Sequence, residues 1–444
     1  MKNVLTALIL LLWLTPAHAQ KRKSTKKTAT SKQPIKKGKG VKPPTAVSKN
    51  AHLLDSILNT TPILRQVKEN RTGYRLQIIY TQITRDANNQ PSFKDYTFNL
   101  DSNLYFYCAS MVKLPISILA LEKINELSGK GLTRATPMLT DSMRLCQTKM
   151  LKDTTSPNGF PNIEHHIRKM LLVSDNVSFS RTLEFVTPDY AHQRMRQLGF
   201  PSARLGGRFD VACIGAGNNW MNQIRFIGTD GRLLFTQPGD SVRLHLDPPI
   251  ANMKVGKNVY RKKKLVSTPK DFSHSNFMPL TTIHRILRNL VFMQNMPEAS
   301  RYRITADDWK FLMTQMCRYP RESLYPKYDS TRYIDSYKKY LIYGATTKAI
   351  TQDSIRIINI VGRAYGFVSD CAYVVNPSNG TEFMISAVLY TNKRNTFGTG
   401  NYEYDTVGLP FLRDLGVALY RLESQRTRKY KNDLSLFSQY AIEK

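Results

Sequence analysis

The chain has 444 residues, of which 41% are hydrophobic, and its 65 Lys and Arg against 33 Asp and Glu give a formal net charge of +32. This apolar content is enough to bury a substantial core, and the length allows one large domain or two to three ordinary ones. The sequence has no Cys-x-x-Cys pair, no Cys/His cluster and no GxGxxG or Walker-type loop, so nothing in it points to a zinc site or a nucleotide-binding loop. We therefore expect neither a metal nor a cofactor.

The first nineteen residues have the pattern of a secretory signal peptide. Lys2 gives a positive start, residues 4–14 form an apolar run, and Ala17-His18-Ala19 provides small residues around a cleavage point. The run is too short to span a bilayer, and no Cys follows the cut site to suggest a lipid anchor. We predict cleavage near Ala19 and a periplasmic or secreted protein.

Residues 20–50 are predicted to be a basic, disordered tail. From Lys21 to Asn50 there are eleven Lys or Arg and no acidic residue, with Ser, Thr, Pro and Gly between them. Such a segment cannot bury enough apolar surface to offset the entropy lost on ordering. In an exported protein, an anionic envelope polymer or a membrane surface suits this charge better than nucleic acid does. The alternative is a solvated tail that only spaces the domain from a surface.

The folded part follows as a series of elements predicted from apolar periodicity and turn residues. In chain order they are a helix over 52–68, strands over 74–84 and 95–100, a helix over 106–127, further helices to about Gln197, a hairpin over 224–235, helices over 280–294 and 307–316, strands over 354–361, 371–375 and 382–391, and a helix over 409–423.

This order predicts an α+β fold. Strands from both ends of the chain would build one antiparallel sheet flanked by helices, and the middle of the chain would form a helical lobe. We predict one domain over residues 51–430, with an insertion at about 213–341 and a C-terminal tail over 431–444. A ligand would be expected in a cleft between the lobe and the sheet.

Five cysteines allow at most two internal disulfides in an oxidising compartment. They are Cys108, Cys146, Cys213, Cys317 and Cys371. Their wide spacing leaves the pairing open, and the odd cysteine must be buried or reactive.

Ser110 and Lys113 begin an apolar stretch, FYCASMVKLPISILALEKINEL, at residues 106–127. Residues three apart share one face of a helix, so the Lys113 amine would lie within reach of the Ser110 hydroxyl. Apolar neighbours would lower the pKa of the amine and make it a base, and the helix N-terminus would favour a developing anion. Three other Ser-x-x-Lys patterns in the chain open no apolar helix. The alternative is that Ser110 only caps a core helix and that Lys113 is solvated.

A second motif stands at the end of the helical pattern MLLVSDN, where Ser174-Asp175-Asn176 follows an apolar run. Ser-x-x-Lys at a helix start together with Ser-Asp-Asn on a connecting loop is the combination found in penicillin-binding proteins and class A β-lactamases. The late strands and the terminal helix also occur in that family's order. The sequence therefore resembles this family of serine acyl-transferases, which act on penicillins and on D-Ala-D-Ala peptides, over roughly residues 51–425.

The resemblance implies an acyl-enzyme on Ser110, formed with a β-lactam or a peptidoglycan-type amide or ester, in a protein expected to be monomeric. Lys113 would accept the Ser110 proton, directly or through water, and Ser174 would pass a proton to the leaving nitrogen. Asn176 would hydrogen-bond the substrate amide and orient Lys113. Asp175 would be a structural partner that fixes the loop.

The third motif of the family, Lys-Thr/Ser-Gly, is altered here to Ile360-Val361-Gly362. Gly362 keeps the close approach to the nucleophile, and the backbone N–H of Arg363 is a candidate second oxyanion donor. The ammonium that would hold a substrate carboxylate is missing. The replacements that the sequence leaves open are Lys348, Lys393 and Arg394.

The deacylating motif of class A enzymes, Glu-x-x-Leu-Asn, is also missing. The matching region, LGFPSARLGGRFDVACIGAGNN, has no Glu, and Asp210 is its only carboxylate. An acyl-enzyme is therefore expected to hydrolyse slowly, as in a penicillin-binding protein. The rival hypothesis is a non-catalytic envelope- or peptidoglycan-binding protein that keeps the fold.

Overall fold

The computed structural model describes residues 51–213, 219–242, 252–350 and 354–438. The chain divides into two units, residues 1–46 and 47–444, and every described residue belongs to the second. The predicted signal peptide and basic tail lie outside the described residues, so both stay predictions.

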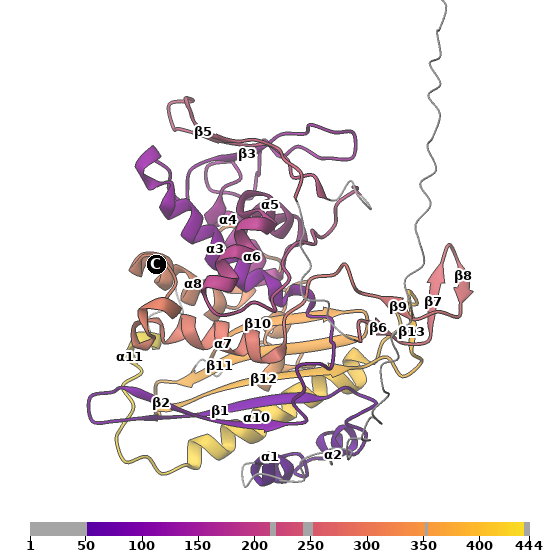
Figure 1. Cartoon of the computed structure of the whole chain (residues 1–444). Helices are drawn as coiled ribbons and strands as arrows, with labels where there is room; N and C mark the ends of the chain where they lie inside the picture. Colours follow the sequence, from indigo (N-terminus) through magenta and orange to yellow (C-terminus); the bar gives the residue numbers. More distant parts are fainter. Residues whose placement is uncertain (1–50, 214–218, 243–251, 351–353, 439–444) are drawn as a thin grey trace, which may run out of the picture. The chain divides into compact units, whose positions relative to one another are not determined.

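The centre of this unit is a five-stranded antiparallel sheet in the order β10-β11-β12-β1-β2 (Figure 1). The strands are β1 (Gln77–Arg85), β2 (Pro91–Phe98), β10 (Arg356–Ala364), β11 (Phe367–Asn376) and β12 (Thr381–Tyr390). β1 pairs with β12, and Tyr80 lies opposite Ile385. Strands from both ends of the domain thus form one sheet, and the predicted α+β fold is confirmed.

Burial along the strands follows from helices that cover both faces of the sheet. Every residue of β11 and β12 is buried, whereas in the edge strand β2 only Tyr96 is buried. On β10, Ile358 and Ile360 point into one apolar core and Ile357 and Val361 into the other, as the period of two residues requires. The sheet therefore separates two cores.

Helices α1 (Ala51–Ile57), α2 (Pro62–Glu69) and α10 (Leu409–Gln425) cover one face (Figure 1). The single helix predicted over 52–68 is wrong, because the chain breaks between α1 and α2. Thr61 caps α2 by accepting a hydrogen bond from Leu64 N, and Pro62 occupies its first position, where a missing N–H costs nothing.

Helix α7 (Leu280–Val291) lies on the opposite face, between the sheet and the helical lobe (Figure 1). Its buried His284 bridges two strands: one ring nitrogen lies 2.8 Å from Thr81 Oγ1 and the other 2.8 Å from Ser386 Oγ. Burial lowers the pKa of His284 to about 4, so the ring is neutral at pH 7 and has one donor and one acceptor nitrogen for these hydroxyls.

The helical lobe comprises the middle of the chain. Its helices are α3 (Lys113–Glu126), α4 (Ile163–Val173), α5 (Asn176–Val186), α6 (Pro188–Gln197) and α8 (Ala306–Cys317). A small sheet at its far end contains β3 (Met138–Thr140), β4 (Ile224–Ile227) and β5 (Leu233–Gln237), so the predicted hairpin over 224–235 is confirmed.

Short elements complete the unit. They are β6 (Lys254–Val255), β7 (Asn258–Arg261), β8 (Lys264–Val266), β9 (Lys270–Asp271), β13 (Thr396–Phe397), α9 (Tyr340–Tyr343) and α11 (Ser435–Ser438). Leu434 and Phe437, inside the segment predicted as a C-terminal tail, are buried against the core. None of the described helices is long and apolar enough to cross a membrane.

Candidate active site

Ser110 lies in a single 3-10 turn, η1 (Ala109–Val112), and α3 begins only at Lys113. The continuous helix predicted from residue 106 is therefore wrong in its first turns. The reason is Ala109, whose φ of 47° is left-handed and cannot continue into a helix. Strained backbone of this kind persists where the surrounding structure holds it, and here it directly precedes the candidate nucleophile.

The amine of Lys113 brings the predicted residues together. Its Nζ lies 3.0 Å from Ser110 Oγ and 2.8 Å from Ser174 Oγ. It also lies 2.6 Å from the carbonyl oxygen of Ser174 and 2.7 Å from Asn176 Oδ1. Three residues from two distant segments thus converge on one nitrogen.

Burial lowers the pKa of Lys113 to about 7. The negative charges of Asp175 and Asp210 act in the opposite direction and raise this pKa, but by less than burial lowers it. A neutral amine has two N–H donors and one lone pair. The carbonyl oxygens of Ser174 and Asn176 can only accept, so they take the two donors. The lone pair is then available to a hydroxyl proton, and the Ser110 Oγ is within hydrogen-bond distance.

The Ser-Asp-Asn segment forms the tight junction between α4 and α5. Ser174 ends α4 with a left-handed φ of 61°. Asp175 is the N-cap of α5, where its side chain accepts a 2.7 Å hydrogen bond from Ser178 N. Asn176, the first residue of α5, donates through Nδ2 to Asp210 Oδ2 at 2.9 Å, and this fixes its Oδ1 toward Lys113.

Gly362 of β10 packs directly against the segment that carries Ser110, the candidate nucleophile. A Cβ at this position would collide with the carbonyl oxygen of Cys108 and would lie 2.8 Å from Ser369 Oγ. Only glycine lets β10 come this close to the backbone two residues before Ser110. The next residue, Arg363, is exposed and has no ion-pair partner among the described residues.

A cavity of about 410 Å³ opens beside Ser110, between the lobe and the end of β10. Its walls include Ser110, Asn176, Asp210 and Arg363 together with Tyr107 and Tyr365. The structure thus brings Ser110, Asn176 and Arg363 to one cavity. Tyr107 and Tyr365 were not predicted as site residues, because they are far apart in the sequence and belong to neither motif.

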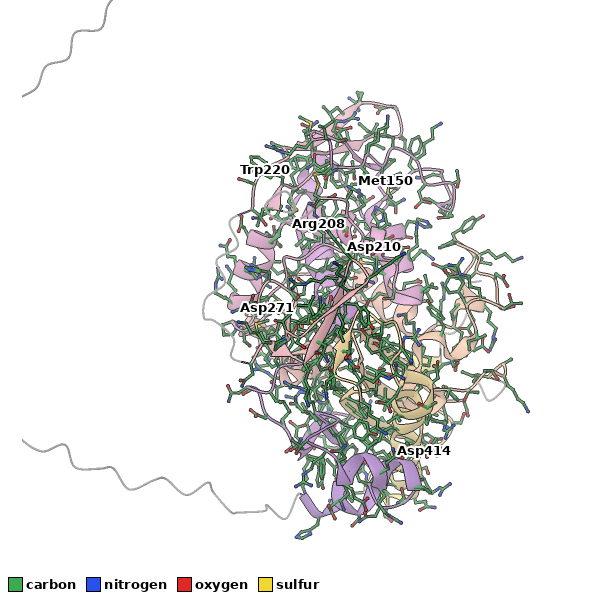
Figure 2. The ribbon with its side chains drawn as sticks, turned by 90° about the vertical axis from the view of Figure 1, so that its right-hand side faces the viewer. Met150, Arg208, Asp210, Trp220, Asp271 and Asp414 are labelled. Atoms are coloured by element: carbon green, nitrogen blue, oxygen red, sulfur yellow. A yellow bond between two sulfur atoms is a disulfide. The ribbon has the colours of Figure 1, made fainter. Side chains whose placement is uncertain are left out.

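Two contacts attach the segment that carries Asp210 to α5; Arg208 and Asp210 of this segment are labelled in Figure 2. Arg208 forms an ion pair with the fully buried Glu184. Ser180 Oγ donates to the Phe209 carbonyl oxygen at 2.5 Å and accepts from Phe209 N at 2.9 Å. These contacts hold Asp210 in the position from which it binds Asn176.

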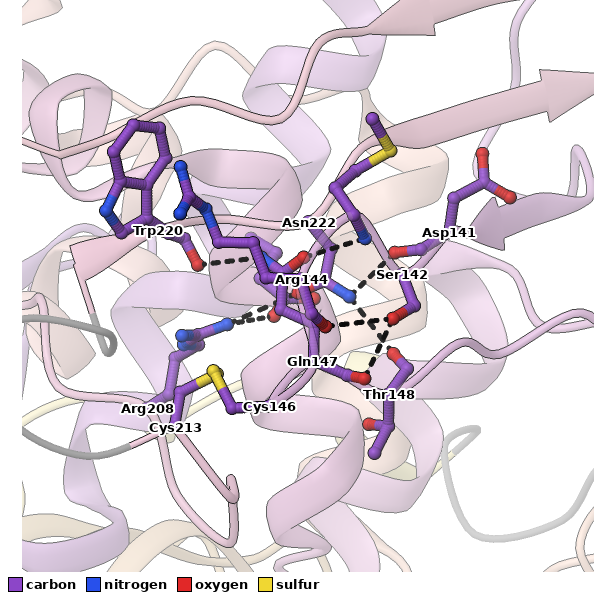
Figure 3. The surroundings of a disulfide bond; sticks show 12 residues. Asp141, Ser142, Arg144, Cys146, Gln147, Thr148, Arg208, Cys213, Trp220 and Asn222 are labelled. Atoms are coloured by element: carbon purple, nitrogen blue, oxygen red, sulfur yellow. Dashed lines mark hydrogen bonds and ion pairs between the residues drawn. A yellow bond between two sulfur atoms is a disulfide. The ribbon is translucent and has the colours of Figure 1, made fainter. Parts of the chain in front are cut away.

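A disulfide between Cys146 and Cys213 ties the chain just after Asp210 to a loop of the lobe (Figure 3). That loop is itself fixed, because Asn222 Nδ2 donates to the carbonyl oxygens of Asp141 at 2.8 Å and Thr148 at 3.0 Å. The remaining cysteines, Cys108, Cys317 and Cys371, are free and buried. The described residues contain no group of His, Cys, Asp and Glu that could hold a metal ion.

Lys338 is a basic residue of this region that the sequence did not indicate. It ends the turn η7 (Asp335–Lys338) in the predicted insertion, and its carbonyl oxygen accepts a 2.6 Å hydrogen bond from Asn359 Nδ2 of β10. Its pKa is lowered well below the usual value, mainly by burial and to a smaller extent by the positive charges of Lys113 and Arg363. The negative charge of Asp370 raises this pKa in turn. Neither Lys338 nor the replacements left open by the sequence, Lys348, Lys393 and Arg394, line the cavity, whereas Arg363 does.

Substitution Gly362→Ala is expected to destabilise the protein and to displace the Ser110 segment, because the added methyl group has no space. We expect a loss of about 2–4 kcal/mol in the free energy of unfolding, measured by urea denaturation. Gly129→Ala is the matched control, since a Cβ there meets nothing within 4 Å. Equal effects of the two substitutions would contradict the close packing of β10 against the nucleophile segment.

Comparison with known proteins gives a family match for less than half of the chain. A model of the beta-lactamase enzyme family matches residues 64–246, which include Ser110, Lys113 and Ser174–Asn176. A search of curated proteins finds no match.

Solved structures give further likenesses. A beta-lactamase from Chitinophaga pinensis is 11% identical, with 82% of this chain and 99% of that chain covered and a TM-score of 0.45. PBP-A is 12% identical, with 86% of this chain and 98% of that chain covered and a TM-score of 0.44. The beta-lactamase from Streptomyces albus G is 13% identical, with 84% of this chain and 99% of that chain covered and a TM-score of 0.43. Over residues 64–246 the chain is similar to the beta-lactamase enzyme family, and the resemblance indicated by its motifs is confirmed.

Proposed function

We propose that this chain is an exported serine hydrolase that forms an acyl-enzyme on Ser110 with a β-lactam or a peptidoglycan-type amide or ester. The observation that carries the proposal is the position of the Lys113 amine, within 3.0 Å of the Ser110 hydroxyl and with a pKa lowered to about 7. The family match over residues 64–246 supports a function of the serine-hydrolase type.

Acylation follows from this arrangement. Ser110 Oγ attacks the substrate carbonyl carbon while its proton passes to the neutral amine of Lys113. The negative charge on the substrate oxygen is stabilised by backbone N–H groups at Ser110 and at Arg363 on the facing strand. The bond to the leaving nitrogen or oxygen then breaks, and the leaving atom takes a proton from the Ser174 hydroxyl. Lys113, 2.8 Å away, restores that proton.

Deacylation is expected to be slow. It needs a base that activates water on the side of the acyl group away from Lys113, and Asp210 is the only carboxylate that lines the cavity among the described residues. One oxygen of Asp210 is already engaged with Asn176. A stable acyl-enzyme of the penicillin-binding type is therefore proposed over rapid β-lactam turnover.

Export is supported by the disulfide. The Cys146–Cys213 bond is of a kind that persists in oxidising compartments. Together with the signal-peptide pattern, it favours a periplasmic or secreted site of action, where peptidoglycan-type substrates occur. An anionic envelope polymer remains the partner proposed for the basic tail.

Within this function, Lys338 and Arg363 are proposed to replace the missing ammonium of the third motif. The positive charges of Lys113 and Arg363 repel a charged Lys338 and, after burial, lower its pKa well below the usual value. Arg363 lines the cavity and has no ion-pair partner among the described residues. A substrate with a negative group would relieve this repulsion, so we expect a preference for acids over neutral amides.

Labelling by a fluorescent penicillin tests the function. Wild-type protein is expected to carry a covalent label that survives denaturing electrophoresis and to turn over a chromogenic cephalosporin slowly. Ser110→Ala should lose the label, whereas Ser102→Ala, at an exposed serine shortly before it in the sequence, should keep it. If neither penicillin nor an activated ester modifies Ser110, the serine-hydrolase proposal fails and the non-catalytic binding protein is favoured.

The pH dependence of labelling tests the role of Lys113. Because its pKa is lowered, the neutral base is present above about pH 7 and is lost as the pH falls through that value. The labelling rate should therefore level off above an inflection near 7, and Lys113→Arg should abolish it because a guanidinium stays charged. A rate that continues to rise up to the ordinary lysine pKa, about 10.4, would contradict this role.

Substitution Lys338→Met tests the acid preference. Loss of a charged contact should lower kcat/KM for a thioester substrate with a free carboxylate about tenfold or more, and should change kcat/KM for its carboxamide analogue little. Lys338→Arg should retain part of the preference, and Lys348→Met, at an exposed position, is the control. Equal losses on both substrates would indicate a structural role only.

A further inference from the structure

A short hairpin, β7 (Asn258–Arg261) and β8 (Lys264–Val266), extends from the edge of the unit (at the right in Figure 1). All residues from Tyr260 to Ser267 are exposed. The hairpin belongs neither to the large sheet nor to the cavity of Ser110, and the proposed acylation does not use it.

The tip of the hairpin concentrates positive charge. Arg261, Lys262, Lys263 and Lys264 are consecutive, and no carboxylate lies at ion-pair distance from any of them within the described part of the chain. Arg261 and Lys264 are also directly opposite in the strand pairing. Like charges placed opposite each other destabilise a strand pair, so folding alone does not account for this arrangement.

Exposed apolar side chains flank the charged tip. Tyr260 and Leu265 are cross-strand partners on one face of the hairpin, with 44% and 55% of their surface exposed. Val266 follows with 37% exposed. An aromatic and an aliphatic side chain beside a cluster of Lys and Arg is the composition that suits the headgroup region of an anionic bilayer.

The base of the hairpin is firmly attached to the domain. β13 pairs with β7 in parallel, with Phe397 opposite Val259. The Phe397 ring packs against Phe272, with ring centroids 5.7 Å apart, and against Tyr365, which lines the cavity of Ser110. A surface bound by the hairpin would thus have a fixed position relative to the cavity.

We propose that the β7–β8 hairpin docks on the surface of an anionic phospholipid bilayer. Its four basic side chains contact the lipid phosphates, and Tyr260 and Leu265 enter the boundary between headgroups and acyl chains. A soluble polyanion would engage the charges but would leave the apolar pair exposed. This pair therefore favours a bilayer over a dissolved polymer or nucleic acid as the partner.

Vesicle co-sedimentation of the full chain tests the proposal, with phosphatidylglycerol–phosphatidylcholine vesicles compared with phosphatidylcholine alone. Removal of three charges by Lys262→Gln, Lys263→Gln and Lys264→Gln together should weaken binding to the anionic vesicles about 100-fold. The matched control is Lys149→Gln, Lys152→Gln and Lys327→Gln together, three exposed lysines elsewhere on the domain, which should change binding less than about threefold. The control matters because the basic tail is present in every variant.

A second substitution separates a bilayer from other anions. Leu265→Ser should weaken vesicle binding about fivefold or more and leave heparin binding unchanged, whereas Leu151→Ser, which alters another exposed leucine, should affect neither. Melting temperatures verify that the variants are folded. Equal losses in the two lysine triples, no effect of Leu265→Ser on vesicle binding, or equal binding to neutral vesicles would each overturn the proposal.

Discussion

The buried amine of Lys113 is the group on which the arrangement of the site depends. It sits at the start of α3 and reaches both Ser110 and the α4–α5 junction. A charged ammonium buried there would lack a directly bonded carboxylate, so its environment favours the neutral form. One nitrogen therefore joins two segments of the lobe and lies beside Ser110, the proposed nucleophile. Its removal would leave the polar groups of Ser174 and Asn176 without their partner.

Several contacts outside this cluster keep its geometry fixed. Gly362 lets the edge strand β10 lie against the backbone before Ser110, so the cavity has a rigid wall on that side. On the other side, Arg208 and Glu184 anchor the segment from which Asp210 orients Asn176. The site is thus held between a strand and a helix, which suits chemistry that needs several groups at one carbon atom.

The sequence was sufficient to predict the parts of this arrangement that depend on local patterns. Apolar runs located β10, β11 and β12, and local spacing identified Ser110–Lys113 and Ser174–Asn176. The break between α1 and α2 was missed because the apolar periodicity continued across the capping residue Thr61.

Contacts between distant segments outside the two family motifs could not be predicted. Asp210 was noticed only as a lone carboxylate, and nothing in the sequence indicated its bond to Asn176. Lys338 lies in the predicted insertion, outside both motifs, and only the fold lets its charge interact with that of Lys113. The left-handed conformation of Ala109 was likewise invisible, because alanine has no preference for it. Such features follow from tertiary packing, which overrides local propensity.

The most direct test of the account is to locate the acyl group. Wild-type protein incubated with benzylpenicillin, quenched in acid and digested should give, by mass spectrometry, one peptide that contains Ser110 and is heavier by the mass of the intact penicillin, with fragment ions that place the addition on Ser110. A modification on Ser174 or another residue, or an unmodified Ser110 peptide at saturating penicillin, would contradict the assignment of Ser110 as the nucleophile activated by Lys113.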